Sequence, residues 1–252
     1  MPVLATKNDI RRRLRCDPFW SAYALGDLDE HRFAHSRWFG LPEDTALGLL
    51  YCEFAQPVFF YQGSPRTLQH LLPEIPFEAP TQLQIRPDAL AVLSSRIPIS
   101  AKKAMIRMRL ESHDPQHTAA EQLSSTDVAV LQALYDSGAP SGESPDFFFP
   151  SMLEEGFFFG VRQKDAVLAA AGTHIVSRSE GVAAIGNVYT HHQHRGRGFA
   201  THVTAAVVQA LLLAGIQTII LNVAAHNSAA MHVYRKLGFV PHCDFFEGQT
   251  AG

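Results

Sequence analysis

The pattern of apolar and polar residues predicts a regular series of strands and helices in the second half of the chain. Short apolar runs at 157–162, 166–176 and 182–190 are separated by turn-forming residues, which is typical of three consecutive strands. An apolar stretch at 205–213 is long enough for a buried helix, which Gly215 ends. The run at 218–223 then predicts another strand.

The first 115 residues carry a less regular pattern. We expect helices over 8–15, 19–25 and 65–72, and strands over 32–38, 46–54, 57–61, 82–85 and 104–110. A polar stretch at 116–121 follows, and Ser125–Asp127 is predicted to cap a helix that runs to about Tyr135. The chain is therefore predicted to be an α+β protein with two parts, a smaller lobe at 1–115 and a domain at 116–252.

The segment 191–201 joins a predicted strand to a predicted helix and has the features of a phosphate-binding turn. Gly196 and Gly198 allow the backbone to curl so that successive N–H groups point to one place, and the following helix adds its positive N-terminal dipole. Arg195 and Arg197 add cationic side chains that suit a pyrophosphate. These features together favour a ligand site over an ordinary surface loop.

Two common nucleotide-binding motifs do not fit this segment. The chain contains no Gly-Lys-Ser or Gly-Lys-Thr, which a P-loop needs, and Thr201 stands where a dinucleotide fingerprint has its third glycine. The segment instead resembles the acetyl-CoA loop of the GNAT superfamily of N-acetyltransferases, Arg/Gln-x-x-Gly-x-Gly/Ala, which Arg195, Gly198 and Ala200 satisfy. The block 227–239 is similar to that family's Asn-x-x-Ala-x-x-x-Tyr-x-x-x-Gly-Phe segment.

The resemblance is specific over the last third of the chain and extends in a looser form to about residue 118. It implies a mostly antiparallel central sheet flanked by helices, acetyl-CoA as acyl donor, and no metal. It implies that Tyr234 is the general acid that protonates the departing thiolate. The residues that it assigns to the cofactor are Val188, Tyr189, Thr190, Arg195, Gly196, Arg197, Gly198, Phe199, Ala200, Thr201 and Asn227.

The lobe at 1–115 contains no such loop. Its order of predicted elements resembles a degenerate GNAT-like half that has lost its cofactor site. An unrelated α+β cap is the alternative interpretation.

The sequence does not identify a general base. The strand at 182–190 has no carboxylate, whereas some members of the family carry a glutamate there. His174, Asn187 or Tyr189 would have to orient a water, and Asp146, Glu154 or Glu155 would have to reach in from the loop side. An α-amino group has a pKa near ~8 and a lysine-like amine near ~10.4, so the missing carboxylate favours a low-pKa acceptor amine or a water-relayed base.

Composition narrows the class of partner. The chain has 252 residues, of which 46% are hydrophobic, and a formal net charge of -3, which argues against a general nucleic-acid-binding protein. The arginine-rich stretch 11–15 is interpreted as part of a helix surface. No apolar segment reaches the ~18 to 20 residues of a membrane span, and residues 1–4 lead into no signal-peptide core. We expect a cytoplasmic protein without nucleic-acid or membrane partners.

Cysteine and histidine usage favours a site without metal. Cys16, Cys52 and Cys243 are far apart in sequence and are expected to be free thiols. The closely spaced histidines at 191, 192, 194 and 202 raise a transition-metal site as a rival, which we disfavour because no carboxylate partner lies close in sequence.

Two function classes remain open on the sequence. The first is an N-acetyltransferase that moves an acetyl group from acetyl-CoA to a primary amine of a small molecule, amino acid or peptide by direct attack in a ternary complex. The second is a catalytically weak acyl-CoA binding or sensor protein. Asn227 and Tyr234 are both present, which favours the enzyme. The sequence leaves both a monomer and a homodimer open.

Overall fold

The structure is a computed structural model that describes residues 6–42, 44–78, 80–114, 118–145 and 147–251. The chain divides into two compact units. The first unit contains the chain up to Arg107, together with Val223–Asn227 and the residues from Pro241 onward, and the second contains Met108–Asn222 and Ser228–Val240. The predicted boundary between residues 115 and 116 lies outside the described residues, so the domain limits 1–115 and 116–252 stay a prediction.

The elements of the first unit begin with helices and continue as strands joined by further helices. They are α1 (Lys7–Leu14), α2 (Ala22–Gly26), α3 (Glu30–Phe33), β1 (Ser36–Phe39), β2 (Leu47–Tyr51), β3 (Val58–Gln62), α4 (Pro65–Leu71), the 3-10 turn η1 (Leu72–Glu74), β4 (Gln82–Ile85), α5 (Pro87–Ser94) and most of β5 (Ile99–Leu110). The predicted strand at 32–38 is wrong at its start, because residues up to Phe33 form α3. The Phe33 ring stacks on Trp38 with the ring centres 6.3 Å apart.

The elements of the second unit follow in chain order. They are β6 (Glu121–Gln122), the 3-10 turn η2 (Ser125–Asp127), α6 (Val128–Asp136), the 3-10 turns η3 (Ala139–Ser141) and η4 (Pro150–Glu155), β7 (Phe159–Gln163), β8 (Ala166–Ser177), β9 (Val182–Thr190), the 3-10 turn η5 (His192–His194), α7 (Phe199–Leu213), β10 (Thr218–Ala224), α8 (Ser228–Lys236) and β11 (Phe239–Thr250). The last residues of β10 and most of β11 are grouped with the first unit. The observed cap begins one residue before the predicted one. Ser124, not Ser125, is the N-cap, and it forms a reciprocal capping box with Asp127 over η2.

From β1 in the first unit and from β7 in the second, the two units share one order of strands and one pattern of strand pairing. In the first unit β1 pairs with β2 and β2 with β3 antiparallel, whereas β3 and β4 are parallel. In the second unit β7 pairs with β8 and β8 with β9 antiparallel, whereas β9 and β10 are parallel. A helix, α4 or α7, stands in the chain between the two parallel strands of each unit, as a crossover connection requires.

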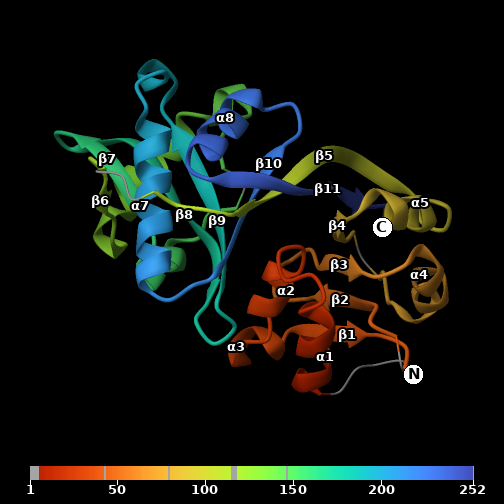
Figure 1. The fold of residues 1–252 in the computed structure, drawn as a ribbon. Helices are drawn as coiled ribbons and strands as arrows, with labels where there is room; N and C mark the ends of the chain where they lie inside the picture. Colours follow the sequence, from red (N-terminus) through yellow and green to blue (C-terminus); the bar gives the residue numbers. More distant parts are fainter. Residues whose placement is uncertain (1–5, 43, 79, 115–117, 146, 252) are drawn as a thin grey trace. The chain divides into compact units, whose positions relative to one another are not determined.

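This arrangement confirms the predicted mixed α/β fold with a mostly antiparallel sheet flanked by helices. In the second unit α7 packs on β8, β9 and β7, and Figure 1 shows it running across these strands. The helix α6 packs on β8, where Leu131, Leu134 and Tyr135 join Phe158 and Tyr189 in one buried cluster. Both α6 and α7 therefore pack on the strands of this unit. This packing holds the end of β9 and the start of α7 in place, and with them the connection between the two elements.

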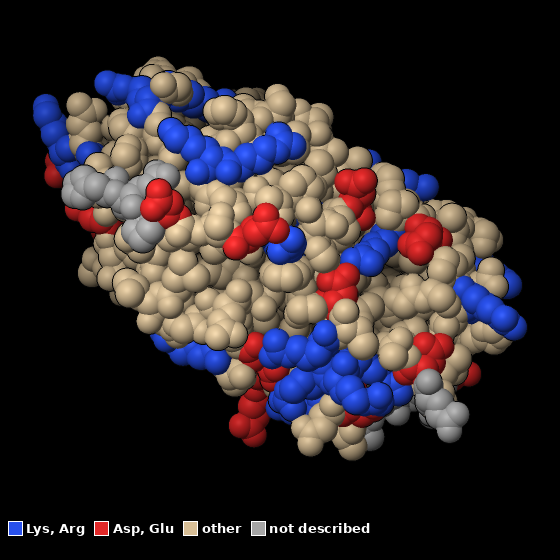
Figure 2. Space-filling model, viewed as in Figure 1, with Lys and Arg blue, Asp and Glu red and all other residues tan. Residues whose placement is uncertain are grey.

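The arginine-rich stretch near the N-terminus lies on α1, as predicted. Arg12 is exposed and forms an ion pair with Asp9, whereas Arg13 is buried and donates to the carbonyl oxygens of Leu41 and Ala46 at 3.0 and 3.1 Å. The interpretation as a helix surface is therefore wrong for Arg13, which holds the helix against the following loop. Figure 2 shows basic side chains gathered over the region of α1 with acidic side chains beside them.

Among the described residues, no helix combines the length and hydrophobicity needed to cross a bilayer.

Candidate functional site

The parallel strands β9 and β10 separate partway along their length. Their register runs from Val182 opposite Thr218 to Ile185 opposite Leu221. β9 then continues to Thr190 along β8, with Tyr189 opposite Ala170. Within the described part of the chain, residues 186–190 therefore leave β10 while they stay in the sheet with β8. The predicted cofactor residues Val188, Tyr189 and Thr190 all lie on this diverging segment.

The connection from β9 to α7 has the backbone shape that the sequence predicts. Gly196 and Gly198 have φ of +74° and +80°, in the left-handed region that glycine adopts at least cost. Nothing lies within 4 Å of the place where a Cβ would stand on either residue. Gly198 is the N-cap of α7, and no side-chain hydrogen bond from it caps the first turn. The first turn of α7 thus lies beside open space that an anion can enter.

Arg195 ties this loop to the segment that follows α6. Its two terminal nitrogens donate to the two carboxylate oxygens of Glu143 at 3.0 and 2.8 Å, and its Nε donates to the Thr190 carbonyl oxygen at 3.2 Å. The hydrogen bonds that Arg195 donates to Glu143 are the main cause of the raised pKa of Arg195. The pair is nearly half exposed, so it is readily exchanged for another anion. Sequence reasoning missed Glu143, because its neighbours are Gly, Ser and Pro without a periodic pattern.

The other charged side chain of the loop has different partners. Arg197 lies 3.2 Å from His194 Nδ1 and over the Phe199 ring at 5.6 Å from its centre. Ala200 and Thr201 continue the first turn of α7 and are partly buried. The loop therefore presents one guanidinium that is already paired with a carboxylate and one that lies over an aromatic ring.

The histidines of the loop pack together, with the rings of His191 and His192 stacked and the ring of His194 tilted against that of His191. The rings of His191 and His192 lie 4.5 Å apart, and those of His191 and His194 lie 5.5 Å apart. Burial lowers the pKa of His191, and the adjacent cationic groups lower it further. In the part of the chain that the structure describes, no group of three or more His, Cys, Asp or Glu side chains is arranged to hold a metal ion.

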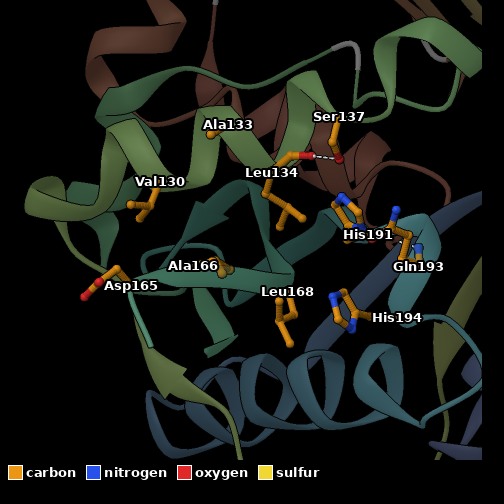
Figure 3. Close-up of a pocket in the computed structure, with 11 residues that line it drawn as sticks. Val130, Ala133, Leu134, Ser137, Asp165, Ala166, Leu168, His191, Gln193 and His194 are labelled. Carbon is orange, nitrogen blue, oxygen red and sulfur yellow. Dashed lines mark hydrogen bonds between the residues drawn. The ribbon is translucent and has the colours of Figure 1, made fainter. Parts of the chain in front are cut away.

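A cavity of about 380 Å³ lies beside the start of this loop (Figure 3). Figure 3 shows Val130, Ala133 and Leu134 of α6 on one side, Ala166 and Leu168 of β8 below, and His191, Gln193 and His194 at one end. The walls are mostly apolar, and the polar groups stand at the loop end and at Asp165. Neither Gly196 nor Gly198 lines this cavity.

Tyr234 lies on α8 within the second unit. It is 7% exposed, its ring packs against Phe239 with the centres 6.2 Å apart, and burial raises the pKa of its hydroxyl to about 12. The hydroxyl is therefore protonated at neutral pH and is available as a hydrogen-bond donor.

The remaining predicted residues are dispersed. Asn227 directly precedes α8, its backbone N–H donates to the Ala224 carbonyl oxygen at 2.8 Å, and it is grouped with the first unit. Glu154 and Glu155 lie on η4, where Glu154 is exposed. Asp146 lies outside the described residues.

His174 and Asn187 are brought together by the β8–β9 pair. Asn187 has a φ of +53° in the middle of β9, its carbonyl oxygen accepts a hydrogen bond of 2.9 Å from the buried Tyr135 hydroxyl, and its side chain lies beside His174. Burial lowers the pKa of His174 to about 4, and the hydrogen bond with Asn187 opposes part of this shift. The sequence analysis named both residues as candidates to orient a water, but it did not predict that they are neighbours.

Comparison with known proteins agrees with this geometry. Residues 128–239 match the model of the family described as the acetyltransferase (GNAT) family. A mycothiol acetyltransferase of Renibacterium salmoninarum is 29% identical over 186 residues, which cover 70% of this chain and 53% of that protein. The chain thus spans about half the length of this curated relative.

Solved structures share the fold over nearly the whole chain. A putative GNAT-family acetyltransferase of Novosphingobium aromaticivorans has 19% identity and a TM-score of 0.60, covering 90% of this chain and 95% of its own. A tandem GNAT protein from the clavulanic acid biosynthesis pathway has 12% identity and a TM-score of 0.58, covering 99% of this chain and 98% of its own. At these identities the likeness concerns the fold alone, and it extends to the first unit.

Proposed function

We propose that this chain, whose residues 128–239 belong to the acetyltransferase (GNAT) family, transfers the acetyl group of acetyl-CoA to a primary amine in a ternary complex. The acceptor class is the amine of a small molecule, an amino acid or a peptide. We place the reaction in the cytoplasm, without a nucleic-acid, membrane or metal partner.

One observation carries this proposal. The loop between β9 and α7 places two left-handed glycines, Gly196 and Gly198, at the start of a 15-residue helix, next to a strand that has left its parallel neighbour. Backbone N–H groups at such a helix start attract a pyrophosphate, and the diverging strand 186–190 has backbone groups on one side that an extended amide-containing arm can pair with. A single ligand that carries both a pyrophosphate and such an arm fits this pair of features.

The chain's own residues then have separate tasks. The loop residues 195–201 hold the pyrophosphate, Val188, Tyr189 and Thr190 hold the arm, and Asn227 is a further cofactor contact by resemblance. Tyr234 donates a hydrogen bond to the departing sulfur. Because the pKa of its hydroxyl is raised, Tyr234 lowers the charge on the sulfur by hydrogen bonding more than by complete proton transfer.

The experiment is a screen for release of free CoA thiol from acetyl-CoA. The panel contains amino acids, spermidine, kanamycin and short peptides with free N-termini, and mass spectrometry identifies the acetylated product. Turnover of at least one amine, with equal amounts of thiol and acetyl-amine, is the expected result. Tight binding of acetyl-CoA without turnover of any class would instead support the acyl-CoA sensor.

A further inference from the structure

Glu143 occupies a cationic group that the β9–α7 loop offers to an anion. The two oxygens of its carboxylate accept hydrogen bonds of 3.0 and 2.8 Å from the two terminal nitrogens of Arg195. A guanidinium binds a phosphate through the same fork of parallel N–H donors, so a carboxylate and a phosphate compete for these two nitrogens. Arg195 Nε donates to the Thr190 carbonyl oxygen at 3.2 Å. The guanidinium therefore lies between the end of β9 and the segment that carries Glu143.

The segment 138–144 carries Glu143 and contacts the end of β9 at a second point. A Cβ on Gly138 would stand 2.8 Å from the Tyr189 ring and hydroxyl, so the backbone of Gly138 packs directly on that side chain. Residues 139–143 are exposed, and the 3-10 turn η3 within them buries none of its residues. Burial therefore fixes the start of the segment, whereas Glu143 is tied to the loop by an ion pair at the surface.

The pair of Glu143 and Arg195 gives way to a stronger anion. The side chains of Arg195 and Glu143 are 44% and 45% exposed, and ion pairs this exposed contribute little to stability. The hydrogen bonds from Arg195 and from Ser141 lower the pKa of Glu143, so its carboxylate is charged at neutral pH. A pyrophosphate carries more negative charge than one carboxylate, and it repels that carboxylate at close range.

Resting on the function proposed above, we infer that Glu143 is an internal competitor of the acetyl-CoA pyrophosphate for Arg195. In the chain without cofactor the carboxylate holds the guanidinium. When acetyl-CoA binds, the pyrophosphate takes the two terminal nitrogens of Arg195. The segment 138–144 then loses its tie to the loop, while Gly138 stays against Tyr189.

This competition makes Glu143 a determinant of donor affinity. Breaking the ion pair opposes the binding of each donor that carries a pyrophosphate, and it does not affect a donor that has the arm without a phosphate. The product CoA carries the same pyrophosphate as acetyl-CoA, so Glu143 weakens its binding equally. Because product release limits the turnover of many enzymes, the carboxylate lowers donor affinity and favours the release of CoA.

The test compares Glu143→Gln with Glu121→Gln. Glu121 is a matched control, because it is an exposed carboxylate of the same unit that pairs with an arginine, Arg162. Both substitutions remove one negative charge, and β7 and β8 lie between β6, which carries Glu121, and β9 in the sheet.

Isothermal titration calorimetry with acetyl-CoA measures the competition directly. At ~0.05 M salt the Kd should fall about three- to tenfold for Glu143→Gln and should keep its wild-type value for Glu121→Gln. The gain should shrink below about twofold at ~1 M salt, where charges are screened over ~3 Å. A residue that only stabilises the loop would give the opposite sign, because its loss would weaken the binding of acetyl-CoA.

Two further ligands separate the pyrophosphate from the rest of the donor. S-acetylpantetheine has the arm and the acetyl group without a phosphate, and its Kd, measured by displacement of acetyl-CoA, should differ by less than about twofold between Glu143→Gln and the wild type. CoA should gain affinity by the same factor as acetyl-CoA.

A second readout uses the wild-type chain. The backbone N–H groups of Ser141 and Glu143 donate to the Gly138 carbonyl oxygen at 3.2 and 3.0 Å. Saturating acetyl-CoA should speed hydrogen exchange in peptides that cover 138–144 at least about threefold, because the segment is released from the loop. Peptides that cover β7 should be unchanged. In Glu143→Gln the exchange over 138–144 should already be fast without a ligand.

The outcomes separate this inference from the proposed function. If acetyl-CoA binds but no amine is acetylated, the proposed function fails, and the Kd of Glu143→Gln still decides the role of Glu143. If Glu143→Gln binds acetyl-CoA no tighter than the wild type, if S-acetylpantetheine gains affinity to the same extent, or if acetyl-CoA slows exchange over 138–144, the inference is overturned and the proposed function stands. A wild-type chain that binds no acetyl-CoA would overturn both.

Discussion

Replacing Gly198 by aspartate tests the proposed phosphate site at its centre. Gly198 has a φ of +80° at the N-cap of α7, with nothing within 4 Å of the added Cβ. Aspartate tolerates this left-handed conformation better than most residues, and a negative charge at a helix N-terminus is favourable. We therefore expect the folded chain to accept the substitution at a cost on the order of 1 kcal/mol.

The aspartate at position 198 should weaken binding of the pyrophosphate by charge repulsion. A carboxylate about 5 Å from one phosphate charge raises the free energy of binding by about 1 kcal/mol in water-like surroundings and about 3 kcal/mol at an effective dielectric constant of about 20. A loss of acetyl-CoA affinity of at least ~10-fold, or ~1.4 kcal/mol, follows. Because the charges are near the surface, the loss should shrink as salt is raised above ~0.15 M.

Gly215→Asp is the matched control for this substitution. Gly215 also has a φ of +80° with nothing within 4 Å of its Cβ position, but it follows the opposite end of α7. Isothermal titration calorimetry with acetyl-CoA should give a weakened Kd for Gly198→Asp and a wild-type Kd for Gly215→Asp, with unchanged circular dichroism for both. Less than a threefold effect at Gly198, or an equal effect at the two positions, would refute the phosphate assignment.

Three further results are expected. Calorimetry should find one acetyl-CoA per chain, and a stoichiometry of two would contradict a first unit without a site. Tyr234→Phe should lower turnover on the order of 10²-fold with acetyl-CoA affinity within twofold, and turnover within twofold of wild type under rate-limiting chemistry would leave Tyr234 a structural residue. Gly238→Ala should lower the melting temperature by about 5–10 °C, because its φ is +90° and its Cβ would stand 1.8 Å from the Ser112 carbonyl oxygen. Gly181→Ala, at a φ of +66° in open space, should lower it much less, and equal losses would show that the contact with Ser112 is not the cause.

The elements around the loop could be predicted from the sequence because their signals are local. β9 occupies Val182–Thr190 and α7 ends just before Gly215. The two loop glycines, which were expected to let the backbone curl, adopt the left-handed conformation. Each of these features depends on residues within about one helical turn of one another. The strand at 82–85 in the first unit was predicted for the same reason.

The contacts that depend on distant residues could not be predicted in this way. Glu143 reaches Arg195 across 52 residues of chain. Asn187 meets His174 across the β8–β9 pair, in a region where the register of the two strands shifts. The helix α5 was also missed, although Pro87 at its first turn is a typical start signal. The pairing of β11 with β4 joins residues 246–249 to residues 82–85, and no local pattern specifies such a partner.

The two units differ at the connection where we propose the phosphate site. In the second unit eight residues, 191–198, separate β9 from α7, whereas in the first unit only Gly63 and Ser64 separate β3 from α4. Ser64 Oγ already accepts the Thr67 N–H at 3.1 Å, and Pro65 at the start of α4 has no N–H to offer. A Cβ on Gly63 would stand 2.2 Å from Ala46 Cβ, so the connection is packed against its neighbour where the second unit has open space. The shared strand order supplies the same framework to both units, but the length of one connection and the capping of one helix decide where an anion can bind.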